Sequence, residues 1–376
     1  MTTINQDQLE ELFGYVEGIV AEGKVPAAQI AIGHDGELAA MRSFGKAHQG
    51  LSVQPASDDT LFCMFSATKA VVGVGVWKLL DEGLLDLDER VVDIVPGWCA
   101  EGGGEAAYAD VTVRQVMLHT GGFPHAPMHP RLWEDREARL RRMMGWRLNW
   151  TPDTQWEYHA TSAHWVLAEI ISQKTGEDFR DWLRANLLDP MGMDNLFVGL
   201  ANDEHERAAS IVYTEEPLPV DGGEVFPQTI LHFNLASQRR AGCPGGGAFA
   251  TAADVAMFYQ GLLNPSDDGP LSASAIELGT TVQTNPDRHT DPLSGIHVNR
   301  ALTVVLAGDD GLSEERGFGS GASPRAFGHA GAGGQIAWGD PETGLSLGFV
   351  TNGFQQDENI RERTAAIGTM AAACVS

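Results

Sequence analysis

Strand-forming patterns lie at both ends of this 376-residue chain, and helical patterns fill its middle. Residues 27–33 and 38–44 are largely apolar runs joined by His34-Asp35-Gly36, which is typical of a β-hairpin. Strand patterns return only beyond about residue 300, in the runs 301–307, 333–339 and 344–353. We therefore predict that the first and last segments of the chain share one antiparallel sheet.

Apolar residues recur at helical spacing between these two ends, with Gly- and Pro-rich loops separating the helices. The clearest helical runs are 113–118, 162–175 and 252–263. A chain of this length exceeds one ordinary core. We therefore predict an α/β (α+β) fold with two parts, a sheet domain flanked by helices and an inserted all-α domain. We expect the active site in the cleft between them. Their expected limits are 1–83 with 266–376, and 84–265.

Composition and charge restrict the partners of the chain. Its 51 acidic and 25 basic side chains give a formal net charge of −26, which repels phosphate backbones and anionic lipids. We expect no nucleic-acid or membrane partner, and a homo-oligomer stays open. The first 24 residues predict an acidic amphipathic helix instead of a signal peptide, so we expect the cytoplasm. The four scattered cysteines predict free thiols.

Ser66 and Lys69 are the first candidate catalytic pair. They are three residues apart at the start of a predicted helix over 66–80, so their Cβ atoms lie about 5–6 Å apart on one face. A serine hydroxyl becomes a good nucleophile when a neighbouring base takes its proton, and an amine in apolar surroundings can do so. The alternative is an N-capping serine followed by a surface lysine.

Two further motifs accompany this pair in a fixed order, Tyr158-His159-Ala160 and His329-Ala330-Gly331. With them the chain resembles the serine β-lactamase and penicillin-binding-protein superfamily, in the class C-like branch that includes family VIII carboxylesterases and D-aminopeptidases. The likeness covers most of the chain and includes the segments 79–98, 111–123, 244–263 and 327–353.

The resemblance implies a role for each motif. Ser66 would attack the acyl carbonyl, Lys69 would help to remove its proton, and Tyr158 would act as general base and then as acid toward the leaving group. The backbone N–H groups of Ser66 and Ala332 would hold the oxyanion, and Gly331 would let the backbone approach the substrate closely.

Two departures from the family pattern bear on the substrate. Relatives that process β-lactams or peptidoglycan commonly carry Tyr-x-Asn and Lys-Thr-Gly, whereas this chain has Ala160 and His329 at the matching positions. A fixed positive charge for a substrate carboxylate is therefore expected to be missing. The resemblance then implies a carboxylesterase for small to medium esters, without cofactor or metal, and with possible acyl transfer to an alcohol. Substrate-binding or supporting residues would be His329, Gly331, His119, Phe123 and Trp156.

Several alternatives stay open. The intact Ser/Lys/Tyr set also suits an amidase, a D-aminopeptidase or a weak β-lactamase, and a non-catalytic member of the fold is a further alternative. Gly344-Leu345-Ser346-Leu347-Gly348 matches the Gly-x-Ser-x-Gly pattern of α/β-hydrolases, although Ser346 lies in a strand pattern. Cys63 is either a second nucleophile or a buried thiol.

Two loop segments have alternative interpretations as well. His119, His125 and His129 could suggest a metal site, but no set of carboxylate partners accompanies them. The Arg-rich segment 131–147 predicts a salt-bridged amphipathic helix or a lid over the pocket, to which Trp150 and Trp156 would add aromatic wall.

Overall fold

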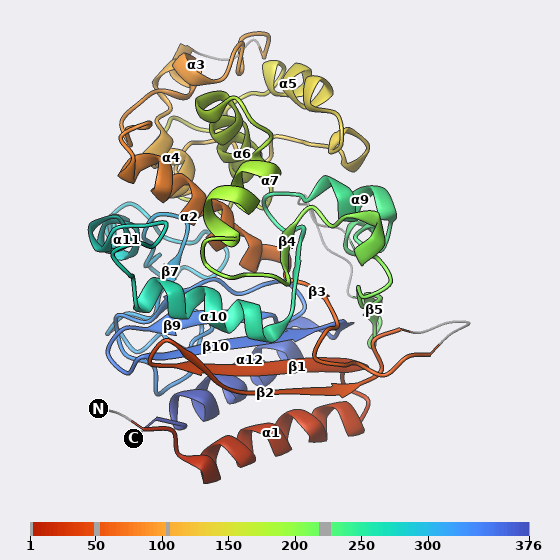
Figure 1. Ribbon diagram of the computed structural model, residues 1–376. Helices are drawn as coiled ribbons and strands as arrows, with labels where there is room; N and C mark the ends of the chain where they lie inside the picture. The colour runs from red at the N-terminus through yellow and green to blue at the C-terminus, as the bar shows by residue number, and fades with distance from the viewer. Residues whose placement is uncertain (1–2, 49–52, 103–105, 218–226, 376) are drawn as a thin grey trace.

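A six-stranded sheet built from both ends of the chain forms the base of the molecule in the computed structural model (Figure 1). The structure describes residues 3–48, 53–102, 106–217 and 227–375. The strand order is β2-β1-β10-β9-β8-β7, and every neighbouring pair is antiparallel. The predicted α/β class with an antiparallel sheet from both chain ends is confirmed. The strands are β1 (Ala27–His34), β2 (Glu37–Gly45), β7 (Val305–Leu306), β8 (Phe327–Gly328), β9 (Ile336–Asp340) and β10 (Leu345–Thr351).

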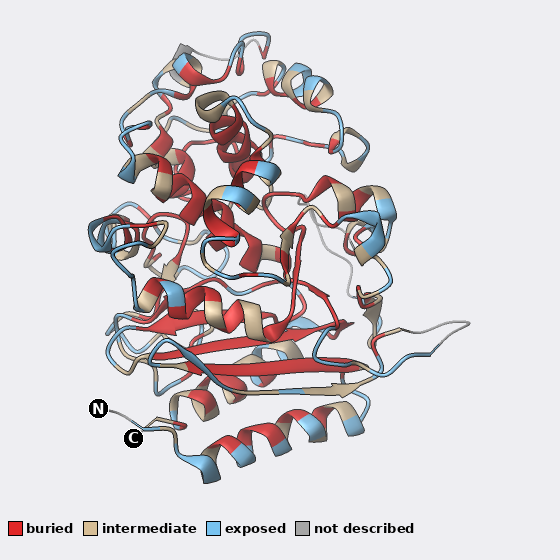
Figure 2. Cartoon of the chain, viewed as in Figure 1, coloured by how far each residue is buried: buried red, intermediate tan, exposed pale blue. Residues whose placement is uncertain are grey.

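The predicted hairpin at the start of the sheet is present. Asp35 and Gly36 both have positive φ, +50° and +86°, which is the backbone of a type I′ turn. In the centre of the sheet, β1 pairs with β10 so that Ile30 lies opposite Phe349. Nearly all residues of these two strands are buried (Figure 2), because helices cover both faces of the sheet.

The predicted strand over 301–307 is wrong for its first half. Only Val305–Leu306 is strand, because residues 301–304 form a tight turn in which the N–H of Ala301 donates to the carbonyl of Val304 at 3.0 Å. Thr303 in this turn has φ +68°, a left-handed conformation incompatible with a continuous strand.

Helices from distant parts of the sequence cover the two faces of the sheet (Figure 1). Helices α1 (Gln6–Ala21) and α12 (Asp357–Ala372) pack on the outer face, and the N–H of Asn5 donates to the carbonyl of Cys374 at 2.8 Å. Helix α10 (Ala252–Leu263) packs on the inner face. A Cβ on Gly348 of β10 would lie 2.3 Å from the Ala252 carbonyl, so glycine allows this close approach.

The helical part of the molecule stacks above α10 (Figure 1). Its longest helices, α2 (Thr68–Asp81) and α6 (Ser162–Thr175), are buried along most of their length (Figure 2). The helices predicted over 113–118, 162–175 and 252–263 correspond to α4, α6 and α10. The division into 1–83 with 266–376 and 84–265 stays a prediction. The other α-helices are α3 (Val91–Ile94), α4 (Val113–Met117), α5 (Arg136–Met144), α7 (Phe179–Leu183), α8 (Pro227–His232), α9 (Ala236–Ala241) and α11 (Ala273–Thr280).

Short elements complete the fold. Strand β6 (Ala248–Ala250) joins β3 (Phe62–Cys63) to β4 (Leu196–Val198), and β5 (Val212–Tyr213) pairs with β11 (Gly353–Phe354). Among the described residues, no helix is long and apolar enough to cross a membrane. The remaining helical turns are η1 (Phe65–Ala67), η2 (Ala106–Asp110), η3 (Pro130–Leu132), η4 (Arg184–Leu188) and η5 (Asn202–Glu204).

Candidate active site

Ser66 lies in the short 3₁₀ turn η1, between the small sheet and the first turn of α2. The preceding residue, Phe65, is buried and has φ +45°, a conformation that costs free energy for any residue with a side chain. Edge-to-face contacts with Phe233 and Phe354, at centroid distances of 5.5 and 5.0 Å, hold the Phe65 ring. This turn leaves Ser66 partly exposed at the wall of a pocket.

Lys69 is fully buried one helical turn after Ser66. Its Nζ lies 3.3 Å from Ser66 Oγ and donates to the carbonyls of Ala160 and Gly245, both at 2.6 Å. Polar partners therefore surround the amine, as burial of such a group requires. The predicted contact between the two side chains is present. The alternative, an N-capping serine followed by a surface lysine, is wrong because Lys69 is buried.

Tyr158 reaches the same point from the segment that precedes α6. Its ring centroid lies 4.9 Å from Lys69 Nζ, and its buried hydroxyl has no hydrogen-bond partner among the described residues. Both Tyr158 and Ser66 line the pocket. The three residues that the sequence singled out thus meet around one small volume.

A tight turn after β8 carries Ala332 to the edge of this pocket. A Cβ on Gly331 would lie 2.2 Å from the carbonyl of Met64, so only glycine lets the turn come this close to the segment before Ser66. The buried side chain of Gln335 fixes the turn to β10, because its amide exchanges two hydrogen bonds with the backbone of Thr351.

Four buried histidines, His119, His159, His164 and His329, stand around Tyr158 and Lys69. Burial lowers the pKa of His159 to about 3 and holds the pKa values of the other three well below the ordinary value. All four rings are therefore neutral at pH 7. For His329 this agrees with the expectation that the position carries no fixed charge.

Hydrogen bonds set the orientation of two of these rings. His119 Nδ1 accepts from the N–H of His159 at 3.1 Å, and its ring centroid lies 4.9 Å from that of Tyr158. His159 Nε2 accepts from the N–H of Phe123 at 3.0 Å. Phe123 and Trp156 are both buried in this layer, and neither is among the described residues that line the pocket. Their role as substrate-binding or supporting residues stays a prediction.

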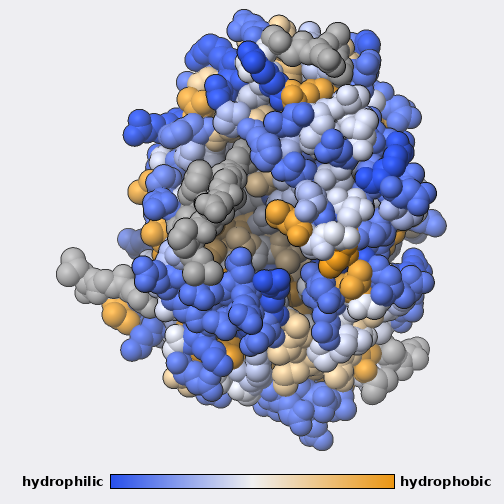
Figure 3. All heavy atoms as spheres, turned by 180° about the vertical axis from the view of Figure 1, so that it is seen from behind, coloured by the Kyte–Doolittle hydropathy of each residue, from blue (hydrophilic) through white to orange (hydrophobic). Residues whose placement is uncertain are grey.

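The pocket has a volume of about 850 Å³ and extends from Ser66 along largely apolar walls. On the face seen in Figure 3, the surface is hollowed near its centre and apolar atoms lie around the hollow. No Lys, Arg, Asp or Glu occurs among the described lining residues. The apolar lining includes Pro127, Met128, Pro130, Trp133, Ile230 and Phe233.

The Arg-rich segment 131–147 contributes one wall of this pocket through Trp133. Its helical part is α5, which is tied to α6 by an ion pair between Arg136 and Glu169 at 2.7 Å. The ion pair fits the interpretation as a salt-bridged helix, and Trp133 lines the pocket; a lid over the pocket stays a prediction. Trp150, like Trp156, is not among the described lining residues.

The loop histidines have separate environments. His119 is buried, His125 pairs with Glu157 at 3.1 Å, and His129 Nδ1 accepts from the N–H of Arg131. Among the described residues, no group of three or more His, Cys, Asp or Glu side chains could hold a metal ion.

The two rival nucleophiles are both buried. Ser346 lies within β10, as its pattern predicted, and its Oγ donates to the carbonyl of Ala256 at 2.8 Å. Cys63 donates to the carbonyl of Gly246, and burial raises the pKa of its thiol to about 12. Neither position offers an accessible nucleophile at neutral pH.

Sequence reasoning missed three groups at this site. The carbonyls of Ala160 and Gly245 hold Lys69, but they are backbone atoms and leave no side-chain signal. Arg300 is buried against Tyr158, with its guanidinium carbon 5.3 Å from the ring centroid. No spacing or motif in the sequence links Arg300 to Tyr158, because the two residues are 142 positions apart.

Comparisons with known proteins agree with this fold and these motifs. The chain is 28% identical over 329 residues to the esterase/beta-lactamase LipL of Mycobacterium tuberculosis, which covers 79% of this chain and 70% of that protein. A penicillin-binding protein homologue from Caulobacter crescentus superposes with a TM-score of 0.80 at 25% identity, over 99% of both chains.

A family VIII carboxylesterase has the same fold, with a TM-score of 0.80 at 22% identity over 99% of both chains. The predicted resemblance to the β-lactamase and penicillin-binding-protein superfamily is confirmed. Because the Beta-lactamase family model matches residues 12–369, the chain belongs to the beta-lactamase family of serine hydrolases.

Proposed function

We propose that this chain is a serine carboxylesterase that acts through a covalent seryl-acyl intermediate. The observation that carries the proposal is the convergence of Ser66, Lys69 and Tyr158, with Ser66 and Tyr158 in the wall of an apolar pocket. A volume of about 850 Å³ accommodates an organic ester of moderate size. The esterase/beta-lactamase relative supports the same reaction class.

The geometry suggests how Ser66 is activated. Two directions around Lys69 Nζ are occupied by the carbonyls of Ala160 and Gly245, and the third faces Ser66 Oγ at 3.3 Å. A neutral amine would donate its two hydrogens to the carbonyls and direct its lone pair at the serine hydroxyl. Lys69 and Tyr158 together then take the Ser66 proton as the Oγ–carbon bond forms.

The same groups complete the reaction. The negative charge on the ester oxygen would be held by the backbone N–H groups of Ser66 and Ala332. The Lys69–Tyr158 pair returns its proton to the departing alcohol when the carbon–oxygen bond to that alcohol breaks. Water then attacks the acyl group by the reverse route, which releases the carboxylic acid and restores the Ser66 hydroxyl. An alcohol in place of water would give acyl transfer.

The charges at the site favour neutral substrates. His329 is neutral at pH 7, and the described pocket lining holds no lysine or arginine. A substrate carboxylate would leave water without gaining a fixed positive partner, whereas an ester carries no such charge. This supports an esterase in preference to an enzyme for carboxylate-bearing lactams or peptides.

A substrate panel tests the proposal. We expect a series of p-nitrophenyl esters from acetate to octanoate to be hydrolysed with higher kcat/KM than a chromogenic cephalosporin or a D-alanine p-nitroanilide. The reason is that only the ester avoids both a carboxylate and a poor amine leaving group. Faster turnover of the cephalosporin would contradict the proposal and favour a β-lactamase, the second candidate, which the double name of the Mycobacterium tuberculosis relative supports.

A cytoplasmic location stays a prediction from the sequence.

A further inference from the structure

Arg300 is a buried cation that packs against the ring of Tyr158 and is not among the described residues that line the pocket. Its guanidinium carbon lies 5.3 Å from the ring centroid of Tyr158 and 5.4 Å from that of Trp156. The residue is only 8% exposed, and its buried Nη1 has no hydrogen-bond partner among the described residues. A buried charge is costly unless something compensates it.

Carboxylates do not provide this compensation. No ion pair within 4.0 Å joins Arg300 to an Asp or Glu of the described residues, although Asp291 acts on Arg300 from a longer distance. Burial lowers the pKa of Arg300, and Tyr158 and Asp291 act to raise it. An arginine keeps its proton even so at any pH of interest. The aromatic faces of Tyr158 and Trp156 are therefore its nearest partners.

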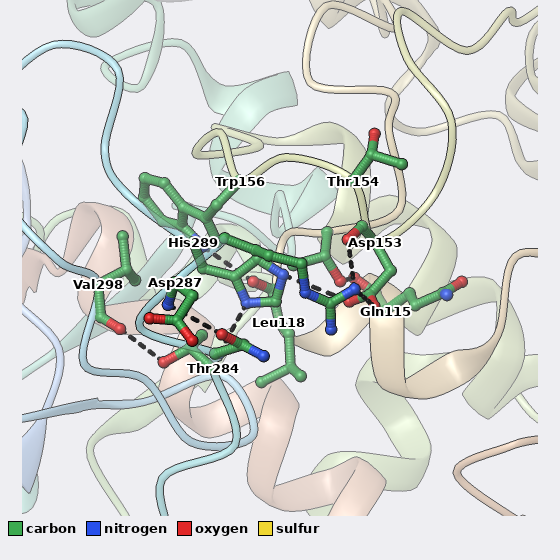
Figure 4. A network of polar contacts seen from close by, with 12 residues as sticks. Gln115, Leu118, Asp153, Thr154, Trp156, Thr284, Asp287, His289 and Val298 are labelled. Carbon is green, nitrogen blue, oxygen red and sulfur yellow. Dashed lines mark hydrogen bonds and ion pairs between the residues drawn. The ribbon is translucent and has the colours of Figure 1, made fainter.

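A polar network around Thr284, His289 and Asp153 lies next to the segment that carries Arg300 (Figure 4). The N–H of Arg300 donates to Thr284 Oγ1 at 3.1 Å, and Thr284 in turn donates to the carbonyl of Val298 at 2.6 Å. His289 Nε2 lies 3.3 Å from Asp153, in the loop that leads to Trp156 and Tyr158. This network links the segment that contains Arg300 to the loop that contains Tyr158, although the two residues are 142 positions apart in the sequence.

Titratable groups from four parts of the chain surround Tyr158. Lys69 lies on α2, His119 follows α4, His329 follows β8, and Arg300 precedes β7. The two histidines are neutral because of their burial. Fixed positive charge beside the tyrosine ring therefore comes from Arg300, and from Lys69 whenever its amine is protonated.

We propose that Arg300 is a positioning residue for Tyr158: its guanidinium holds the ring in place and stabilises the negative charge on the tyrosine oxygen during proton transfer. This inference rests on the proposed function, because it assigns Tyr158 the role of base. Arg300 would thus supply, next to the Tyr158 ring, the positive charge that a neutral His329 does not provide. Arg300 is not among the described pocket-lining residues, so it is not positioned as a contact for the substrate.

Charge-removing and charge-keeping variants test the inference. Arg300→Met is expected to lower kcat/KM at pH 7 by roughly 10- to 100-fold, as loss of an opposite charge at about 4–6 Å predicts. KM should stay within about twofold, because substrate binding is unchanged. The acid limb of the pH–rate profile should move to higher pH, because the base loses a neighbouring positive charge. Arg300→Lys should restore most of the activity and the profile.

Arg139→Met provides a matched control. Arg139 is also buried and stacks on an aromatic ring, with its guanidinium carbon 5.0 Å from the Trp165 centroid, but it does not contact Tyr158. Its removal should leave the pH profile in place. An equal loss in Arg300→Lys and Arg300→Met with no change of profile would overturn the inference in favour of packing. A rise of KM limited to carboxylate-bearing substrates would overturn it in favour of a substrate contact.

A second readout separates this inference from the proposed function. The rate at which a fluorophosphonate labels Ser66 reports nucleophile activation without requiring the correct ester. If the native protein is not labelled, the proposed function fails. If the native protein is labelled and Arg300→Met is labelled at the same rate across pH 6–9, only the inference about Arg300 fails.

Discussion

Ser66→Ala is expected to lower kcat for ester hydrolysis by about 10⁴- to 10⁶-fold, because the covalent intermediate can no longer form. The remaining activity would come from substrate binding and from the backbone N–H groups of the oxyanion site. Burial and folding should change little, since Ser66 is partly exposed at the pocket wall. Steady-state kinetics with a p-nitrophenyl ester measure the effect.

Ser346→Ala is the matched control for this loss. Ser346 Oγ lies in β10 beneath α10, where it donates to the carbonyl of Ala256 and accepts from Gln260 Nε2 at 2.9 Å. Its removal affects packing of the helix on the sheet and should leave ester hydrolysis in place. Loss of activity in Ser346→Ala together with retained activity in Ser66→Ala would mean that the nucleophile lies in the Gly-x-Ser-x-Gly segment.

Acidification from pH 7.5 to 5.5 is expected to lower the free energy of unfolding, by up to roughly 5 kcal/mol, through the four buried histidines around Tyr158. Their pKa values in the folded protein lie well below 6.5, and that of His159 is about 3. In the unfolded chain they bind protons near pH 6.5. Stability is therefore full above that pH and is lost as the pH falls below it, and each histidine contributes up to about one quarter of the loss.

One carboxyl group acts in the opposite direction. Burial raises the pKa of Asp254 to about 6, so this carboxyl group binds a proton at higher pH in the folded protein than in the unfolded chain. Acidification over the same interval therefore raises the free energy of unfolding through Asp254, but by only about 1 kcal/mol. Because domains are stable by roughly 5–15 kcal/mol, the histidine effect is a large share of the total. Urea unfolding at the two pH values measures the difference.

Single variants assign the acid sensitivity. His164→Gln should reduce the difference in unfolding free energy between pH 7.5 and pH 5.5 by up to about one quarter, even if the substitution also changes stability at both pH values. Replacement of the exposed His129 by Gln should leave the difference unchanged. A native difference under about 2 kcal/mol would show that the buried rings accept protons without unfolding.

Local patterns in the sequence were sufficient for much of this structure. The Asp35-Gly36 dipeptide predicted the hairpin because both residues tolerate positive φ, and both have it. The helical spacing after Ser66 predicted the contact with Lys69, since residues three apart share one helix face. These features depend on a few neighbouring residues, and such information is present in the sequence itself.

Features that depend on long-range contacts could not be predicted in this way. The apolar run 301–307 has the composition of a strand, but the turn at Thr303 divides it, and this turn packs against α2 and α11. Arg300, just before that turn, meets Tyr158 only through the packing of the whole chain. The motif around His329 predicted a missing charge, and only the fold reveals the arginine that stands near it.

Labelling with a fluorophosphonate, followed by intact-mass analysis and peptide mapping, shows which residue is the nucleophile. A single phosphonyl adduct on Ser66 is expected in the native protein, slow labelling in Lys69→Met, and none in Ser66→Ala. An adduct on any other residue, or the absence of labelling in the folded native protein, would contradict the account.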